Sequence, residues 1–276
     1  MAEAFFKIVN AGELEVLQPL PTSVGGWSAD QMKGPAVSAA LARATERVAD
    51  RALPGTRPVR WTVDLFRPAG LMPTAISTTL FRKGRRIGLI DAELSQNGKP
   101  IARSRAVFAH PSPTPAGEVW SPERAFPLPP PHLTPLPGEP RIYRTERQGW
   151  TPHAKDHLGG THKQTWHFPV PLVEGEEPTR FQMTAGVADV TNLVSNWGTA
   201  GLEFINADIT LAITRLPAAM ELGLCPIDRT VSDGIAIGTA AVFDRQGQLG
   251  LATVVTLANA AHRVDIARSG TGRMPD

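Results

Sequence analysis

The sequence has little cysteine and no long apolar run. Its single cysteine, Cys225 among 276 residues, cannot form an intramolecular disulfide or a zinc site built from cysteines. No stretch of about 18 uninterrupted apolar residues is present, so we expect no membrane-spanning segment. The start, MAEAFFKIVN, lacks a basic region followed by a long apolar run, so we also expect no secretory signal. These features predict a cytoplasmic location.

Neither sign of charge dominates the chain. The 28 Lys and Arg residues are balanced by 26 Asp and Glu residues, which gives a formal net charge of +2. This balance disfavours a general binder of polyanions, so we expect neither a nucleic-acid nor a membrane partner. Hydrophobic residues make up 42% of the chain and charged residues 20%, a composition typical of a folded protein with a full core.

Proline is concentrated in one segment. Between Pro111 and Pro140, 11 of 30 residues are proline. Proline lacks the N–H that a sheet requires and is excluded from helix interiors, so this stretch predicts an extended connector. We therefore expect an N-terminal domain over 1–110, a linker over 111–140 and a C-terminal domain over 141–276.

The two parts on either side of this linker show the same order of elements. In the front part, helical spacing over 35–50 precedes an alternating strand pattern over 58–67 and three more strand-like runs, at 73–82, 86–95 and 100–109. In the back part, a helical stripe over 187–197 precedes an alternating run over 205–214 and strand-like runs at 220–231, 234–243 and 249–259. Aligning Pro68 with Pro217, or Gly98 with Gly247, gives an offset of 149 residues both times, which indicates duplication.

Several segments together resemble a known family. They are GPAVSAALARATERV (34–48), FRPAGL to RSRAVF (66–108), THKQTWHF (161–168), GVADVTNLV (186–194) and INADITLAITRLP (205–217). Their order is similar to that of the TesB-type acyl-CoA thioesterases, in the double hot-dog thioesterase superfamily. The resemblance implies an α+β tandem (double) hot-dog fold, in which two antiparallel sheets each wrap around a long helix and form a pseudo-dimer.

The same resemblance implies an activity and a site. The family hydrolyses acyl-CoA thioesters without a cofactor, and its members often associate into homo-oligomers. Its catalytic Asp, Thr and Gln correspond here to Asp189, Asn206 and Val255, so one of the three is retained. Thr256 lies one residue beyond Val255, and because successive strand residues face opposite ways, a bulge would be needed to bring it in.

The chemistry of these residue types supports a site near Asp189. A carboxylate can activate water as a general base, and N–H groups at a helix start can stabilise an oxyanion. Asp189 is expected near the start of its helix, where a solvated acid would also be stable. Asn206 and Asp208 are two residues apart on a strand and are expected to share a face and hold one water, although a polar outer face explains them equally well. Asn192 lies within the first turns after Asp189 and could line the same cleft, or bond locally.

Two further clusters have ordinary explanations. Four histidines and an aspartate lie close together in sequence, but Gly159-Gly160 interrupts any helix there, so we expect no metal site. The members of this group are His153, Asp156, His157, His162 and His167. Arg82, Lys83, Arg85 and Arg86 flank Gly84 at a hairpin tip and could meet the phosphates of coenzyme A, although a solvated hairpin is the simpler interpretation.

Three functions remain open from the sequence. The first is an acyl-CoA thioesterase that uses Asp189 and Asn206 for catalysis and Asp208, Asn192 and Thr256 for substrate binding. The second is an acyl-CoA or acyl-lipid binding protein that has lost hydrolysis, because two of the three family positions differ. The third, an enoyl-CoA hydratase, ranks last because no His follows Asp30 or Asp189 at the required spacing.

Overall fold

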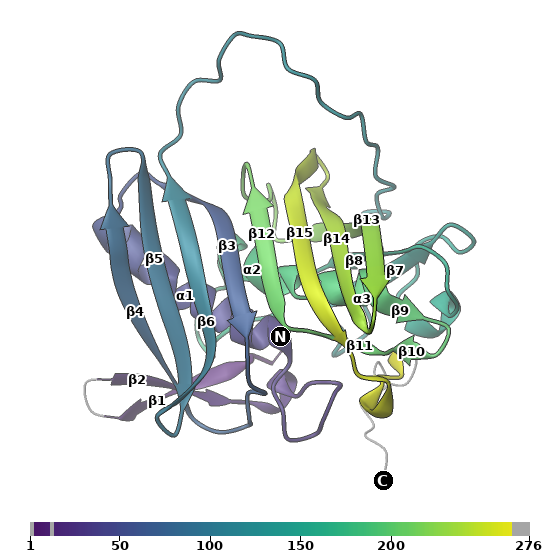
Figure 1. Ribbon diagram of the computed structural model, residues 1–276, viewed down its shortest axis with the longest axis horizontal. Helices are drawn as coiled ribbons and strands as arrows, with labels where there is room; N and C mark the ends of the chain where they lie inside the picture. Colours follow the sequence, from purple (N-terminus) through teal and green to yellow (C-terminus); the bar gives the residue numbers. More distant parts are fainter. Residues whose placement is uncertain (1–2, 12–13, 267–276) are drawn as a thin grey trace.

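One antiparallel sheet organises the molecule. The computed structural model describes residues 3–11 and 14–266, and in these residues 13 strands form a single sheet with the α-helices behind it (Figure 1). The strand order is β1-β2-β4-β5-β6-β3-β12-β15-β14-β13-β8-β7, and β11 also pairs with β15. The predicted double hot-dog arrangement is confirmed, with the two sheets joined edge to edge through β3 and β12.

The front half surrounds a long helix. Helix α1 spans Gly34–Ala52, and a proline in its first turn suits the helix start because the missing N–H would have no partner there. Small residues such as Ala36 and Ala40 face the core and let the helix lie close to its neighbours. The strands of this half are β1 (Phe6–Ala11), β2 (Leu14–Pro19), β3 (Arg57–Leu65), β4 (Thr74–Lys83), β5 (Ile87–Gln96) and β6 (Lys99–Ala109).

The back half contains a shorter, broken helix. Helix α2 spans Arg180–Ala188 and α3 spans Thr191–Asn196, so the predicted stripe over 187–197 was wrong in extent. The start of α2 is set by a capping box, in which Thr179 accepts a hydrogen bond from the Gln182 N–H and Gln182 bonds back to the Thr179 N–H. This T-x-x-Q signal was available in the sequence.

The remaining strands complete the back half. They are β7 (Arg141–Thr145), β8 (Lys163–His167), β9 (Trp197–Gly198), β10 (Gly201–Leu202), β11 (Phe204–Asn206), β12 (Asp208–Ile213), β13 (Leu222–Ser232), β14 (Ile235–Asp244) and β15 (Gly247–Ala258). Strands β9 and β10 pair only with each other, in a separate small sheet.

The strand registers confirm the duplication and correct its offset. The order β4-β5-β6-β3 of the front half is mirrored by β12-β15-β14-β13 of the back half. The front hairpin closes with Gln96 opposite Lys99 and the back hairpin with Asp244 opposite Gly247, each pair 148 positions from its counterpart rather than 149. Glycine occupies the second turn position in front but follows the turn in the back, which explains the difference of one.

The core joins the two halves. Trp61 from β3 is fully buried, and its ring lies 5.6 Å, edge to face, from that of Phe181 on α2. The Trp61 indole N–H donates to the Ser38 hydroxyl at 3.0 Å, and that hydroxyl donates to the Ala185 carbonyl at 2.7 Å. Strand β3 therefore makes an aromatic contact with the opposite half of the chain, and helix α1 makes a polar one.

The proline-rich segment is extended, as predicted. Residues 110–140 contain neither helix nor strand and run as a long loop between β6 and β7 (Figure 1). Phe126 anchors the segment by stacking on Phe243 with ring centroids 4.4 Å apart. The division into domains at 110 and 141 stays a prediction. Among the described residues, no helix has the length and apolar character needed to cross a membrane.

Replacing Arg43 tests the contact between the halves. Arg43 of α1 is 3% exposed and forms ion pairs with Glu15 of β2 and Glu176 of the back half. We expect Arg43→Met to lower the free energy of unfolding by about 1–3 kcal/mol, because both acids lose a buried partner but remain partly solvated. Arg47→Met, which removes an exposed partner of Glu15, is the control and should cost less than about 0.5 kcal/mol in denaturant unfolding. Equal losses would contradict this interpretation.

Candidate functional site

Asp189 lies where the two halves meet. It ends α2 rather than beginning a helix, so the predicted position near a helix start was wrong. Its backbone is still right-handed helical, with φ −59° and ψ −33°, and α3 begins two residues later. The short break between the helices turns the Asp189 side chain toward α1 of the front half, where it meets Gly34.

Two glycines allow this approach. A Cβ atom on Gly34 would overlap the Asp189 carboxylate, and one on Gly186 would lie 3.1 Å from the Pro35 carbonyl oxygen. Because Gly34 is the first residue of α1, the carboxylate lies at the positive end of the helix dipole, which favours its charged form. The helix N-terminus that lies against the Asp189 carboxylate is therefore that of α1, which belongs to the front half.

Asn206 contacts this carboxylate directly. The Asn206 side-chain amide donates to Asp189 Oδ1 at 2.8 Å. The contact depends on an irregularity in strand pairing at Ala207. Asn206 is opposite Thr256 of β15, whereas Thr210 is opposite Thr253. Between these two pairs, the β11–β12 segment holds one residue more than β15. This bulge turns Asn206 onto the helix side of the sheet. The structure thus brings together the two residues predicted to be catalytic.

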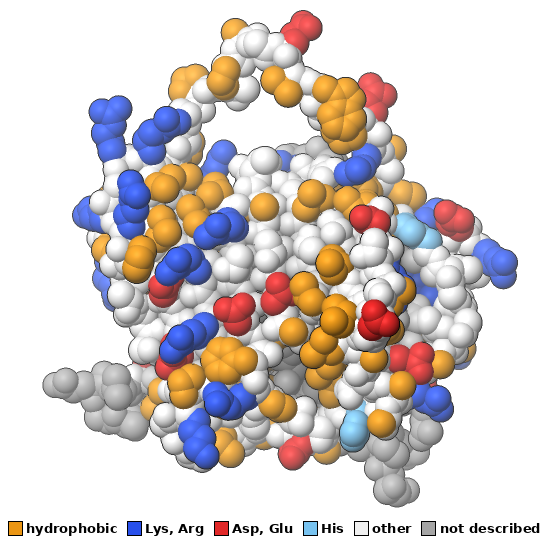
Figure 2. Space-filling view, viewed as in Figure 1, with side chains coloured by type: hydrophobic (Ala, Val, Ile, Leu, Met, Phe, Trp, Pro, Cys, Tyr) orange, Lys and Arg blue, Asp and Glu red, His pale blue; other side chains and the backbone are white. Residues whose placement is uncertain are grey.

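The same bulge separates Asp208 from the site. Asp208 lies opposite the exposed Asp64 of β3, and directly opposed residues share a sheet face, so Asp208 faces away from the helices. Its Oδ1 accepts a hydrogen bond from the Val255 N–H at 2.6 Å. Figure 2 shows acidic side chains together near the middle of this outer face. The prediction that Asn206 and Asp208 share a face was wrong, because the bulge changes the alternation between them.

A second bulge places Thr256 inside. Val242 is opposite Gly250 but Phe243 is opposite Gln248, so β15 holds an extra residue at Leu249. Beyond it, Thr256 is fully buried on the helix side, while Val255 lies on the outer side with its neighbour Asp208. The bulge that Thr256 requires is therefore present.

Asn192 holds strand β11 in place next to the site. It is 4% exposed and donates to the Phe204 carbonyl at 2.8 Å, which fixes β11 immediately before Asn206. Its own oxygen accepts a hydrogen bond from Asn196 at 3.0 Å, and Asn196 also donates to the Thr256 hydroxyl at 3.3 Å. These bonds form a polar network between α3 and the strands. A direct substrate contact by Asn192 or Thr256 stays a prediction.

The environment of Asp189 raises the pKa of its carboxyl group toward neutral pH. Burial raises the pKa of Asp189 to about 6, although the Asn206 hydrogen bond and the nearby positive charge of Arg141 both act to lower it. A carboxylate with this pKa is ionised above pH 6 and still basic enough to accept a proton from water. Buried carboxylates with raised pKa values are typical of catalytic sites.

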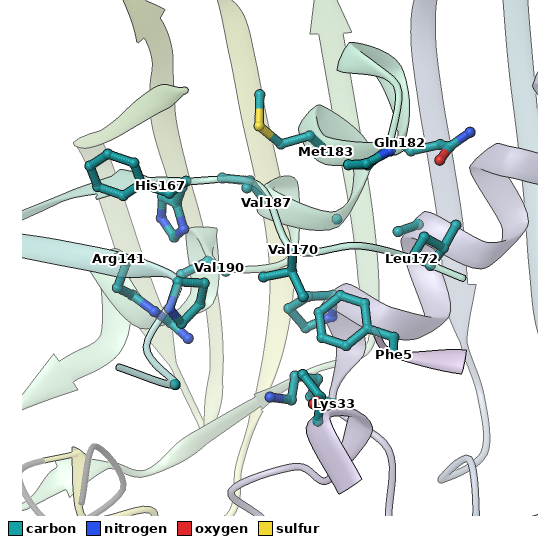
Figure 3. Close-up of a pocket in the computed structure, with 18 residues that line it drawn as sticks. Phe5, Lys33, Arg141, His167, Val170, Leu172, Gln182, Met183, Val187 and Val190 are labelled. Carbon is teal, nitrogen blue, oxygen red and sulfur yellow. The ribbon is translucent and has the colours of Figure 1, made fainter. Parts of the chain in front are cut away.

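A pocket lies beside Asp189, between α1 and α2. It encloses about 70 Å³, and most of its lining side chains are apolar (Figure 3). Its polar members include Lys33, Arg141, His167 and Gln182. Residues on either side of Asp189 line it: Gly186 and Val190 from the helix turn, and Pro35 from the start of α1. Sequence analysis missed Lys33 and Arg141, whose positions in the chain are far apart.

Of the two other clusters, only His167 contributes to this pocket. Across residues 3–11 and 14–266, no three His, Cys, Asp or Glu side chains come together in a way that could hold a metal. His157 is buried against Thr145 and Thr151, and His167 bonds the Thr165 hydroxyl at 2.9 Å. The basic residues beside Gly84 are exposed at the tip of the β4–β5 hairpin.

Comparison with known proteins supports the predicted family. Residues 24–109 match the family model of the acyl-CoA thioesterase N-terminal domain. This match covers most of the front half of the chain. No relative among curated proteins matches the chain.

Solved structures extend the similarity to almost the whole chain. The tesB protein of Mycobacterium avium subsp. paratuberculosis is 16% identical, with a TM-score of 0.64 over 91% of this chain and 95% of its own. The acyl-CoA thioesterase II TesB2 of Mycobacterium marinum is 18% identical, with a TM-score of 0.63 over 98% and 97%. A hot-dog protein of unknown function from Alicyclobacillus acidocaldarius is 18% identical, with a TM-score of 0.63 over 91% and 95%. These matches establish a shared double hot-dog fold, and the predicted resemblance to TesB-type thioesterases is confirmed.

The pKa of Asp189 predicts how stability depends on pH. Because the pKa of Asp189 in the folded protein lies above the ordinary value of 3.8, the stability that this group contributes is present below about pH 4 and is lost as the pH rises through 6. Asp189→Asn removes this titration, so the variant should be more stable than the wild type by about 3 kcal/mol at pH 8.

Denaturant unfolding of both proteins at pH 4 and pH 8 measures the difference. The advantage of Asp189→Asn should disappear at pH 4, where the wild-type carboxyl is already protonated. A variant that is equally destabilised at both pH values would show that the carboxylate is not held in a desolvated site.

Proposed function

We propose that the protein hydrolyses the thioester of an acyl-CoA to a free acid and coenzyme A, with Asp189 activating the water. One observation carries this proposal. A desolvated carboxylate, with its pKa raised to about 6, is held by an amide beside a pocket at the junction of the two halves. The match of residues 24–109 to the acyl-CoA thioesterase N-terminal domain supports the choice of substrate.

The arrangement can perform hydrolysis without a strong acid catalyst. Asp189 accepts a proton as water attacks the thioester carbonyl carbon, which forms the new C–O bond and a tetrahedral oxyanion. The N-terminal end of α1 lies against the carboxylate at Gly34 and favours negative charge in this region. When the C–S bond breaks, the departing thiolate takes the proton back from Asp189.

Asn206 is the positioning residue for this base. Its amide occupies Asp189 Oδ1, so the carboxylate is held in one orientation and the other oxygen is left to meet the water. An amide can donate to the carboxylate, as a threonine hydroxyl can, but it extends further from the strand.

The activity test compares the same isosteric substitution at two positions, Asp189 at the end of α2 and Asp208 at the start of β12. With a panel of short, medium and long acyl-CoAs, Asp189→Asn should lower kcat by about 100-fold or more, because the general base is removed. Asp208→Asn, on the opposite face of the sheet, is the matched control and should retain activity. Release of the free thiol of coenzyme A gives the rate.

Two outcomes would reject hydrolysis at this site. The wild-type protein would leave every member of the panel intact, or Asp189→Asn would turn over as fast as the wild type. Tight binding of an acyl-CoA without turnover would favour the second function, an acyl-CoA binding protein.

The pH dependence provides a second test. Because Asp189 must be ionised to act as a base, kcat/KM should rise with pH below an apparent pKa of about 6 and level off above it. The Asn206 hydrogen bond lowers this pKa, so Asn206→Ala should move the midpoint to higher pH as well as reduce the plateau. A midpoint that Asn206→Ala leaves unchanged would show that another group controls the rate.

A further inference from the structure

Two cations share the otherwise apolar pocket beside Asp189. Lys33 precedes the first residue of α1, and Arg141 begins β7 in the back half, yet both line the same cavity. Their side chains extend into the same end of it (Figure 3). The apolar residues that line the pocket include Phe5, Val170, Leu172, Met183, Val187 and Val190.

Neither cation has a salt-bridge partner in the described residues. Arg141 Nε is buried without a hydrogen bond to any of them. The Lys33 ammonium lies 5.6 Å from the centroid of the Phe5 ring. Burial and the like charge of Arg141 together lower the pKa of Lys33 to about 8, so holding the two groups here is unfavourable without an anion.

The other titratable groups that face this pair do not neutralise it. Glu139 raises the pKa of Lys33, and Arg141 lowers that of Asp189, but within the described residues neither acid forms a salt bridge with either cation. His167 is buried, and its pKa is shifted well below the ordinary value, so it adds no charge at neutral pH. The pocket therefore has a positive end.

We propose that this pocket selects acyl chains that carry a terminal carboxylate, so that the substrates are short dicarboxylic monothioesters of coenzyme A. This inference rests on the proposed function, because it places the acyl chain beside Asp189. The apolar walls suit the methylene groups, and the two cations suit the carboxylate. A cavity of about 70 Å³ is small, which favours a short acyl chain over a long one.

The phosphates of coenzyme A share the anionic chemistry but fit this place less well. A nucleotide diphosphate is far larger than the cavity. Apolar side chains line most of the pocket, whereas phosphate groups need several polar donors. The experiment below separates the two anions.

The test compares pentanoyl-CoA with glutaryl-CoA, which have the same number of carbons in the acyl chain. Arg141→Met should lower kcat/KM for glutaryl-CoA by roughly 10- to 100-fold, because a charge-assisted hydrogen bond is lost. It should leave pentanoyl-CoA within about threefold, since an apolar group replaces an unpaired donor. Arg144→Met removes a cation from the same strand, outside the pocket lining, and should affect neither substrate.

Two results would overturn this assignment. Equal losses for both substrates, with weaker inhibition by free coenzyme A, would assign the cations to its phosphates. No change for either substrate would show that Arg141 does not contact the acyl chain. Because the charge of Arg141 lowers the pKa of Asp189, Arg141→Met should move the pH profile equally with both substrates, so the rates are compared at a pH well above both midpoints.

Binding separates this inference from the proposed hydrolysis. Calorimetry with Asp189→Asn, which should retain the pocket, should show glutaryl-CoA binding at least tenfold more tightly than pentanoyl-CoA. If the wild type hydrolyses neither thioester but this preference is present, the proposed function fails and the carboxylate site stands. If hydrolysis occurs but both ligands bind equally, the carboxylate site fails alone.

Discussion

The close crossing of α1 and α2 is the contact on which the site depends. Gly34 and Gly186 remove the side chains that would hold these helices apart, and Ser38 bonds across to the Ala185 carbonyl at 2.7 Å. Because the helices belong to different halves, this crossing decides whether the Asp189 carboxylate meets the start of α1. The pocket lies between the same two helices, beside that carboxylate. Helix packing and chemistry are therefore coupled in one place.

Two bulges adapt the duplicated sheet to this crossing. The extra residue at Leu249 has a counterpart at Ile101, where Leu94 is opposite Ala102 but Ser95 is opposite Pro100. The break at Ala207 belongs to the back half and turns Asn206 toward Asp189. The bulge at Ile101 and Leu249 is thus common to both halves, whereas the break at Ala207 makes the two halves different. The consequence is a single asymmetric pair of catalytic candidates in a fold with two similar halves.

The electrostatics of the site balance opposing effects. Burial raises the pKa of Asp189, whereas the amide of Asn206 and the charge of Arg141 lower it. Together they leave the carboxylate ionised at neutral pH but basic. Arg141 and Lys33 remain without a salt bridge among the residues described, which gives the pocket a charge that a simple acyl chain would not use. In the proposed function, Asp189 and Asn206 carry out hydrolysis, and the neighbouring Lys33 and Arg141 select the acyl chain.

Local sequence patterns determined the elements, since hydrophobic periodicity and turn residues act over short distances. The helix predicted over 35–50 and the front strands agree with the structure within a few residues, and the T-x-x-Q signal at Thr179 would have placed the start of α2. The candidate pair Asp189 and Asn206 also came from the sequence, through the resemblance to a family. Only the tertiary structure decided that Asp208 faces outward and Thr256 inward, because a bulge changes the side-chain alternation without leaving a clear sequence signal. It alone brought Lys33 and Arg141 together, because their proximity depends on how the two halves pack.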